Sequence, residues 1–152
     1  MRLALFQPDQ AGNVGTVIRL AACLGVPLDV VEPCGFPFSD RALKRAGMDY
    51  AEVAAVTRHA SWAAFEAQVG GRLVLFTTGA DAVRLPEARL LADDTLIFGS
   101  ESRGAPAEVH ARADLRVRIP QAAGTRSLNV AVAAGIGLAE GLRQLGKWPD
   151  AR

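Results

Sequence analysis

The chain has 152 residues, of which 50% are hydrophobic and 22% charged, a composition typical of one folded domain with a sizeable core. Its 17 Lys and Arg nearly balance 16 Asp and Glu, and a net charge of +1 excludes the strongly basic surface of a general nucleic-acid binder, so any RNA contact must come from a local patch. No apolar run is as long as a membrane span, and the start has no signal-peptide pattern. Cys23 and Cys34 form no CxxC pair. We therefore expect a cytoplasmic protein, with a single domain covering residues 1–152.

The first half of the chain alternates between strand and helix patterns. Short apolar runs bounded by Pro, Gly and Asn predict buried strands, and longer amphipathic runs predict helices. In chain order we expect a strand at 3–6, turn chemistry at 7–13, a helix at 14–24, a strand at 27–32, a basic helix at 40–46 and a strand at 51–56.

The second half continues the alternation. Ser61 is a good N-cap for the next helix. We expect helix 61–68, strands 72–77 and 95–98, helix 106–112, strand 115–119 and a long Ala/Gly-rich helix from Val130 to Gly146. This order predicts an α/β fold with a mostly parallel sheet and helices on both faces. Ligands of such sheets bind at the carboxyl ends of the strands, which directs attention to the loops at 76–79, 98–104 and 119–128.

The first candidate motif is Asn13-x-Gly15-x-x-x-Arg19. Asn13 can cap the helix, Gly15 permits close approach of a ligand or another backbone, and Arg19 lies one turn further on the same face. Arg19 is thus placed to meet a phosphate or an acidic partner. The alternative is an ordinary surface arginine extending from an amphipathic helix.

The second motif is the glycine-bracketed loop from Phe98 to Pro106, with Glu101 and Arg103 at its centre. Its two glycines allow exposed backbone amides and an unusual path. It matches neither the P-loop nor the GxGxxG pattern, which argues against the commonest nucleotide sites. Glu101 can bind a ligand hydroxyl or ammonium, or orient Arg19; the alternative is a surface ion pair with Arg103.

The third motif, Arg126-Ser127-Leu128-Asn129, opens the last helix. Ser127 or Thr125 is expected to cap it, and Asn129 offers both a donor and an acceptor. Further along, small residues recur four apart and predict a stripe for tight helix packing, within the core or between subunits. They are Ala131, Gly135 and Ala139, flanked by Leu128, Val132 and Leu142. His59 and His110 have no Cys or carboxylate at ligand spacing, so we expect no metal.

Taken together, the order and spacing of the three motifs resemble the signature blocks of the SPOUT-class RNA 2′-O-methyltransferases. The run from Arg45 to Tyr50 and the ending from Arg143 to Gly146 are most similar to one subfamily, the minimal tRNA (cytidine/uridine-34-2′-O)-methyltransferases. The similarity covers essentially the whole chain. It implies methylation of the wobble nucleotide, C34 or U34 in the anticodon stem-loop, by S-adenosylmethionine (SAM), with S-adenosylhomocysteine as product and without a metal.

The resemblance also implies a deep C-terminal trefoil knot and a homodimer. By position, it places SAM against six residues in the loops named above: Phe76, Thr77, Gly99, Ile119, Ser127 and Leu128. It assigns Arg19 to the ribose 2′-hydroxyl near the partner subunit's cofactor, with Asn13, Glu101, Ser127 and Asn129 shaping the site. Two positions depart from the family pattern, which usually has Ser at the position of Ala131 and an aromatic residue at that of Ala139.

Basic side chains suggest an RNA-facing patch, made up of Arg41, Lys44, Arg45, Arg103 and Arg126. Three other functions stay open from the sequence: methylation of ribosomal RNA, a dimeric RNA- or cofactor-binding protein without catalysis, and a dinucleotide-dependent oxidoreductase. The last lacks its glycine fingerprint. The presence of Arg19 and Asn13 argues against the non-catalytic reading.

Overall fold

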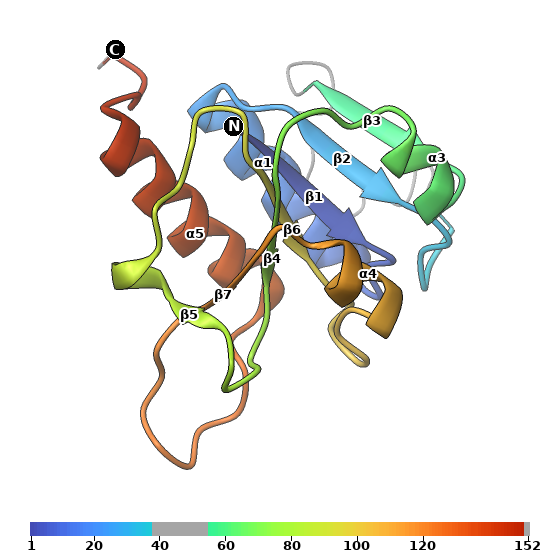
Figure 1. Cartoon of the computed structure of the whole chain (residues 1–152). Helices are drawn as coiled ribbons and strands as arrows, with labels where there is room; N and C mark the ends of the chain where they lie inside the picture. Colours follow the sequence, from blue (N-terminus) through green and yellow to red (C-terminus); the bar gives the residue numbers. More distant parts are fainter. Residues whose placement is uncertain (38–54, 151–152) are drawn as a thin grey trace.

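A computed structural model describes residues 1–37 and 55–150 (Figure 1). Within these residues, a seven-stranded sheet has the order β3-β2-β1-β6-β4-β7-β5, and every neighbouring pair is parallel. The strands are β1 (Arg2–Phe6), β2 (Leu28–Val31), β3 (Val56–His59), β4 (Leu73–Phe76), β5 (Val83–Arg84), β6 (Thr95–Phe98) and β7 (Leu115–Arg118). The predicted parallel α/β fold is confirmed.

Helices cover both faces of the sheet. The long helices α1 (Ala11–Leu24) and α5 (Val130–Leu145) lie on one face, where their buried residues join one core cluster. The short helices α3 (Trp62–Glu66) and α4 (Ala107–Arg112) contribute Phe65 and Val109 to the cluster on the other face. Apolar residues recur three and four apart in α1, so one stripe of that helix faces the sheet.

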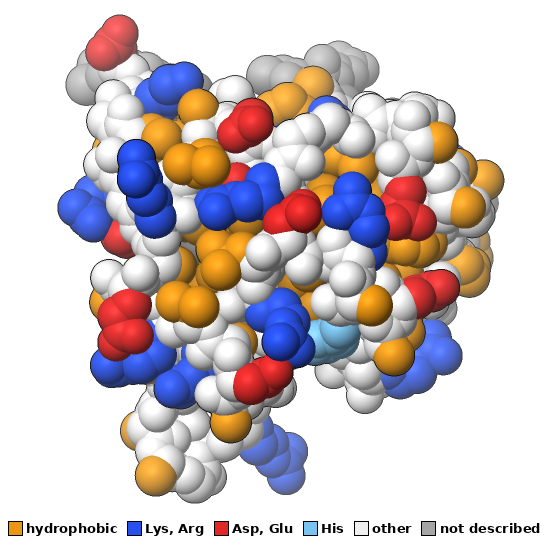
Figure 2. All heavy atoms as spheres, viewed as in Figure 1, with side chains coloured by type: hydrophobic (Ala, Val, Ile, Leu, Met, Phe, Trp, Pro, Cys, Tyr) orange, Lys and Arg blue, Asp and Glu red, His pale blue; other side chains and the backbone are white. Residues whose placement is uncertain are grey.

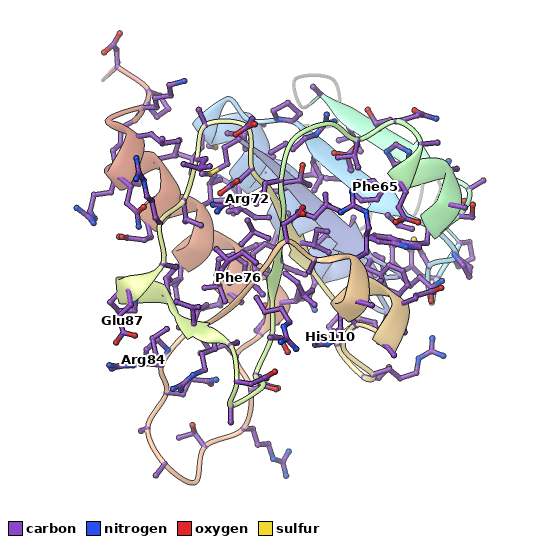
Figure 3. All side chains as sticks on the ribbon, in the orientation of Figure 1. Phe65, Arg72, Phe76, Arg84, Glu87 and His110 are labelled. Carbon is purple, nitrogen blue, oxygen red and sulfur yellow. The ribbon has the colours of Figure 1, made fainter. Side chains whose placement is uncertain are left out.

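The strand register brings four chain segments to one edge of the sheet. Phe98 of β6 lies beside Leu5 of β1 and Phe76 of β4, and Phe76 lies beside Val117 of β7. The carboxyl ends of these strands therefore coincide, and the loops after them leave from the same edge. The rings of Phe76 and Phe98 stack there with centroids 4.7 Å apart. In Figure 3, Phe76 lies inside the fold, whereas Arg84 and Glu87 lie at its outer side.

Several predicted boundaries shift. Helix α1 begins at Ala11, three residues before the expected start. Of the strand expected at 51–56, residues 51–54 lie outside the described residues, and strand β3 runs from Val56 to His59. It is an edge strand, and its exposed Thr57 and Arg58 interrupt the apolar run that would have predicted it. The short strand β5 and the 3₁₀ turn at Leu85–Glu87 were not predicted. The basic helix expected at 40–46 lies outside the described residues.

The segment after β5 is fastened to the C-terminal helix by Gln144. Its Oε1 accepts a hydrogen bond from the Leu90 N–H at 2.9 Å, and its Nε2 donates to the Ala88 carbonyl at 2.9 Å and to Glu140 at 2.8 Å. Glu140 in turn accepts two hydrogen bonds of 2.8 Å from the Arg143 guanidinium. One side chain thus holds residues 88–90 against α5.

The surface is electrically mixed. Figure 2 shows Lys and Arg interspersed with Asp and Glu over the visible face, in keeping with the net charge of +1. Among residues 1–37 and 55–150, no helix combines the length and apolar character needed to cross a membrane.

Candidate functional site

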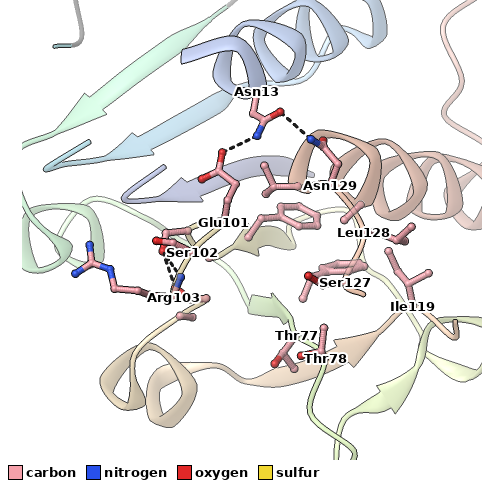
Figure 4. A pocket seen from close by; sticks show the side chains of 18 of the residues that line it. Asn13, Thr77, Thr78, Glu101, Ser102, Arg103, Ile119, Ser127, Leu128 and Asn129 are labelled. Carbon is pink, nitrogen blue, oxygen red and sulfur yellow. Dashed lines mark hydrogen bonds between the residues drawn. The ribbon is translucent and has the colours of Figure 1, made fainter. Parts of the chain in front are cut away.

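A cavity of about 540 Å³ lies at the carboxyl ends of the strands, between the loops after β1, β4, β6 and β7 (Figure 4). Its apolar wall includes the stacked rings of Phe76 and Phe98 together with Ile119, and its rim is polar. The six residues that the sequence assigned to the cofactor all line it: Phe76, Thr77, Gly99, Ile119, Ser127 and Leu128. Asn13, Glu101 and Asn129 line the same cavity.

Three of these side chains form a continuous hydrogen-bonded relay, drawn in Figure 4. Asn129 Nδ2 donates to Asn13 Oδ1 at 2.9 Å, and Asn13 Nδ2 donates to Glu101 Oε1 at 2.7 Å. The groups at the two ends of the relay determine which way each asparagine amide is oriented. A carboxylate only accepts, so Asn13 must turn its amide nitrogen toward Glu101; backbone N–H groups only donate, so Asn129 must turn its oxygen toward α5. The relay gives the cavity two amides of fixed orientation.

Asn129 is also the cap of α5. Its Oδ1 accepts from the backbone N–H groups of Ala131 at 2.8 Å and Val132 at 3.3 Å, which satisfies two donors that the helix cannot satisfy itself. The expected cap at Ser127 or Thr125 is therefore wrong: Thr125 Oγ1 donates to the Ala122 carbonyl instead, and Ser127 is exposed at the cavity. The helix begins two residues later than a Ser127 cap requires.

Asn13 does not cap α1 either. Gln10 holds the N-cap position and makes no side-chain cap hydrogen bond, while Asn13 lies in the first turn with its side chain in the relay. Glu101 is likewise not a partner of Arg103. Its second oxygen, Oε2, accepts from the backbone N–H of Asp9 at 2.7 Å. The local readings of these two residues were overturned by contacts with distant segments.

The loop after β6 is a closed turn that requires glycine. Ser100 and Gly104 exchange backbone hydrogen bonds of 3.1 and 2.8 Å, and Gly104 has a φ of 68°. A Cβ on Gly99 would lie 2.4 Å from the backbone nitrogen of Ala105, so no side chain fits there. Backbone atoms of Gly99 therefore form part of the cavity wall, as the glycine-bracketed pattern predicted.

Ser102, which lines the cavity, and Asp9, which binds Ser102, were both missed by the sequence reading. Asp9 Oδ2 accepts from the Ser102 hydroxyl at 2.6 Å and from the Ser102 backbone N–H at 2.9 Å. These two hydrogen bonds, the hydroxyl's foremost, lower the pKa of the Asp9 carboxyl below its usual value. The only advance signal was an aspartate in turn chemistry at the end of a predicted strand.

Arg19 is placed apart from the other predicted site residues. It is exposed on α1, one turn beyond the buried Gly15, and it is not among the residues that line the cavity in the described part of the chain. Arg103 lines the cavity and Arg126 is exposed on the loop before α5. Arg41, Lys44 and Arg45, the other members of the expected RNA patch, lie outside the described residues.

The packing face of α5 differs from the predicted stripe. Its buried positions include Ala134, Gly137 and Leu138, and Gly137 faces Phe76 so closely that a Cβ would lie 2.7 Å from its Cζ. Ala131 is buried, but Gly135 and Ala139 are only half-buried. On the other side of the helix, the apolar residues Val132 and Ile136 are 50% and 37% exposed, and Leu128, just before the helix, is 37% exposed.

Comparison with known proteins places the chain in a family. Residues 1–139 match the model of the SpoU rRNA Methylase family. A tRNA (cytidine(34)-2′-O)-methyltransferase of Beijerinckia indica is 52% identical over 147 residues, which are 95% of this chain and 91% of that protein. The Escherichia coli K12 protein of the same name is 38% identical, over 99% of this chain and 97% of its own length.

Solved structures of methyltransferases are also similar to this chain. One concerned with 2′-OH methylation of C/U34 on tRNA is 44% identical, has a TM-score of 0.89 and covers 95% of each chain. An rRNA methyltransferase of Sinorhizobium meliloti with bound AdoMet is 32% identical with a TM-score of 0.83, over 95% of this chain and 56% of that one.

Proposed function

Because this chain belongs to the SpoU rRNA Methylase family, we propose that it transfers a methyl group from SAM to the ribose 2′-hydroxyl of nucleotide 34, C or U, in tRNA. One observation carries the proposal. The cofactor loops and the Asn13, Glu101 and Asn129 side chains, separated by up to 116 residues, meet around one cavity in a chain 52% identical to a C34 methyltransferase. The convergence of these side chains on one cavity and the similarity to a methyltransferase both support the proposal.

The cavity suits SAM in size and in character. Its volume of about 540 Å³ lies within the range of small-molecule sites, and it has apolar walls with a few polar groups. The six residues that would hold the cofactor are Phe76, Thr77, Gly99, Ile119, Ser127 and Leu128. SAM supplies a sulfonium methyl group that is already activated toward an oxygen nucleophile. The protein must align the ribose oxygen and help remove its proton.

Within this proposal, the relay orients the ribose. The amides of Asn13 and Asn129 are fixed by Glu101 and by the first turn of α5, so neither must reorganise when substrate binds. Arg19 orients the 2′-hydroxyl and stabilises the negative charge that develops on its oxygen. A guanidinium stays protonated in proteins and is a poor base, so an RNA phosphate is our candidate for the proton acceptor.

A homodimer accounts for the distance of Arg19 from the cavity. The exposed row of Leu128, Val132 and Ile136 starts at the cavity and runs along α5, which packs against α1, the helix of Arg19. Contiguous apolar surface of this kind favours protein contact. In the proposed dimer this face binds its equivalent in the partner, and Arg19 of one subunit acts on the ribose 2′-hydroxyl near the cofactor of the other.

The RNA is held by basic groups around the cavity. Arg103 and Arg126 are our candidates in the described residues, with Arg41, Lys44 and Arg45 as sequence candidates. Arginine suits bidentate phosphate contacts. We further propose that residues 1–152 form a single domain that acts in the cytoplasm, and that its C-terminal segment is knotted. Support for the knot comes from Gln144, which ties α5 to residues 88–90, and from β7, which lies between β4 and β5.

Transfer of labelled methyl from SAM into bulk tRNA, followed by mapping of alkali-resistant 2′-O-methyl positions, tests the function. Label at nucleotide 34 is the expected result. Label in ribosomal RNA but not in tRNA would show that the substrate is ribosomal RNA. SAM binding without label in either RNA, including unmodified transcripts, would favour a non-catalytic protein. Absence of SAM binding in calorimetry would contradict the whole proposal.

A further inference from the structure

Asp9 lies where three loops of the chain meet. The loop after β1 contains it, the loop after β6 contributes Ser102, and the chain after β2 contributes Gly35. The Gly35 N–H donates to the Pro8 carbonyl at 2.9 Å, and the Ser102 hydroxyl and N–H donate to the Asp9 carboxylate at 2.6 and 2.9 Å. Hydrogen bonds thus join the loop after β1 both to the loop after β6 and to the chain after β2.

The backbone at this junction is constrained as well. Gln7 has a φ of 45°, a left-handed conformation that non-glycine residues adopt only when the surroundings enforce it. A Cβ on Gly35 would lie 2.9 Å from the Asp9 Cα and 3.0 Å from its carbonyl oxygen. Little space therefore separates the two loops, and Asp9 cannot move toward Gly35.

Asp9 also contacts the relay directly through its main chain. Its backbone N–H donates to Glu101 Oε2 at 2.7 Å, while Glu101 Oε1 accepts from Asn13. The side chain and the main chain of Asp9 thus bind two successive residues of one turn, Ser102 and Glu101. The contact with Ser102 and the contact with Glu101 therefore support each other, and the Glu101 carboxylate in turn fixes the orientation of Asn13.

We propose that Asp9 is a positioning residue for methyl transfer: its carboxylate clamps Ser102 so that Glu101 holds the Asn13–Asn129 relay in the orientation that the ribose requires. The inference rests on the proposed function. It adds a residue that contacts neither cofactor nor ribose in that proposal and acts through the relay. Asp9 is therefore expected to affect the chemical step more than cofactor binding.

The test compares tRNA methylation by the full-length wild type with that of Asp9→Ala, Asp9→Asn and Ser102→Ala. Asp9→Ala should lower kcat about 10- to 100-fold, because small displacements of reacting groups have effects of this size, with the KM for SAM close to that of the wild type. Asp9→Asn keeps an acceptor oxygen and should recover part of the loss. In the double variant Asp9→Ala/Ser102→Ala the losses should not add, because the two side chains act as one unit.

A second perturbation leaves the Asp9 side chain intact. Gly35→Ala places a methyl group against the Asp9 backbone and should reproduce the fall in kcat. Gly70→Ala is the matched control, because a Cβ there meets nothing within 4 Å and the residue is exposed far from the cavity.

Three outcomes would overturn the inference. They are wild-type kcat in folded Asp9→Ala, additive losses in the double variant, and a loss of S-adenosylhomocysteine affinity as large as the loss of kcat. If Asp9→Ala does not fold, the test rests on Ser102→Ala and Gly35→Ala. A wild-type kcat in both variants would refute the positioning role of Asp9. An inactive wild type would instead count against the proposed function, and the two failures are thereby distinguished.

Discussion

Asn129 donates its side-chain N–H to the side-chain oxygen of Asn13 at 2.9 Å, although 116 residues separate them. One asparagine caps α5, and the other lies in the first turn of α1. The hydrogen bond joins the starts of the two long helices at the rim of the cavity. It makes helix capping and site geometry depend on the same side chain, and suitable substitutions can separate the two roles.

Substitution of Asn129 separates its cap from its relay function. Asn129→Asp keeps an oxygen for the Ala131 and Val132 N–H groups but loses the donor to Asn13, whereas Asn129→Ala loses both. We expect both variants to lose methyl transfer at least about tenfold. Only Asn129→Ala should lose stability, by about 1 kcal/mol. Urea unfolding and tRNA methylation measure the two effects; a stable, fully active Asn129→Asp would rule out a role for the relay.

Arg19→Ala tests the proposed role of the guanidinium. Loss of a group that stabilises developing charge should lower kcat about 100- to 1000-fold. SAM affinity should be retained, because the proposed contact of Arg19 is with the ribose 2′-hydroxyl and not with the cofactor. Calorimetry and tRNA methylation measure both quantities. Near-wild-type turnover would remove Arg19 from the mechanism.

Mixed dimers test whether Arg19 serves the partner subunit. Arg19→Ala is combined with Ser127→Trp, which fills the proposed cofactor cavity. Each homodimer should be inactive, and the mixture should recover activity, because one of its two composite sites holds both an intact Arg19 and an intact cavity. Mixtures of Arg19→Ala with Arg19→Gln serve as the control and should stay inactive. An inactive mixture of Arg19→Ala with Ser127→Trp would favour a site built within one subunit.

Ile136→Asp tests the exposed apolar face of α5. Ile136 is 37% exposed, and a carboxylate there would be buried without a partner in the proposed dimer. We expect sedimentation to show monomers and methylation to be lost, while far-UV circular dichroism is unchanged. Ala111→Asp, an exposed position on α4, is the matched control and should stay dimeric. A dimeric Ile136→Asp protein would place the interface elsewhere.

The Glu140 carboxylate makes a pH-dependent contribution to stability. Hydrogen bonds from Arg143, and then from Gln144, lower its pKa from 4.5 to about 2. A lowered folded-state pKa stabilises the protein above the unfolded-state pKa, and the contribution is lost as pH falls toward the folded-state value. The difference in melting temperature between wild type and Glu140→Gln should therefore shrink from about pH 5 to about pH 3. Glu108→Gln on α4 is the control; a difference constant with pH would contradict the prediction.

Salt dependence of binding tests the RNA contacts. Each arginine that neutralises a phosphate should contribute about one unit to the slope of log affinity against log salt. Arg103→Ala and Arg126→Ala should each lower the slope by about one and weaken binding of the anticodon stem-loop. Arg112→Ala, on α4, should leave the slope unchanged. Slopes equal to wild type in both arginine variants would place the RNA elsewhere.

Local signals in the sequence predicted most of the fold. Apolar runs bounded by turn residues located β1, β2, β4, β6 and β7, and Ser61 caps α3 as expected, accepting from the Ala64 N–H at 3.2 Å. The rule that parallel sheets bind ligands at their carboxyl ends then identified the cavity loops. These predictions succeeded because each depends on residues a few positions apart.

The tertiary structure decided what the polar residues do. Asn13, Glu101, Ser127 and Asn129 were singled out from sequence, but the cap of α5, the partner of Glu101 and the parts played by Asp9 and Ser102 were not found. The hydrogen bonds of this site join residues 88 to 116 positions apart. Short-range patterns cannot encode such a pairing, because it exists only once parallel strands in register bring the loops to one edge of the sheet.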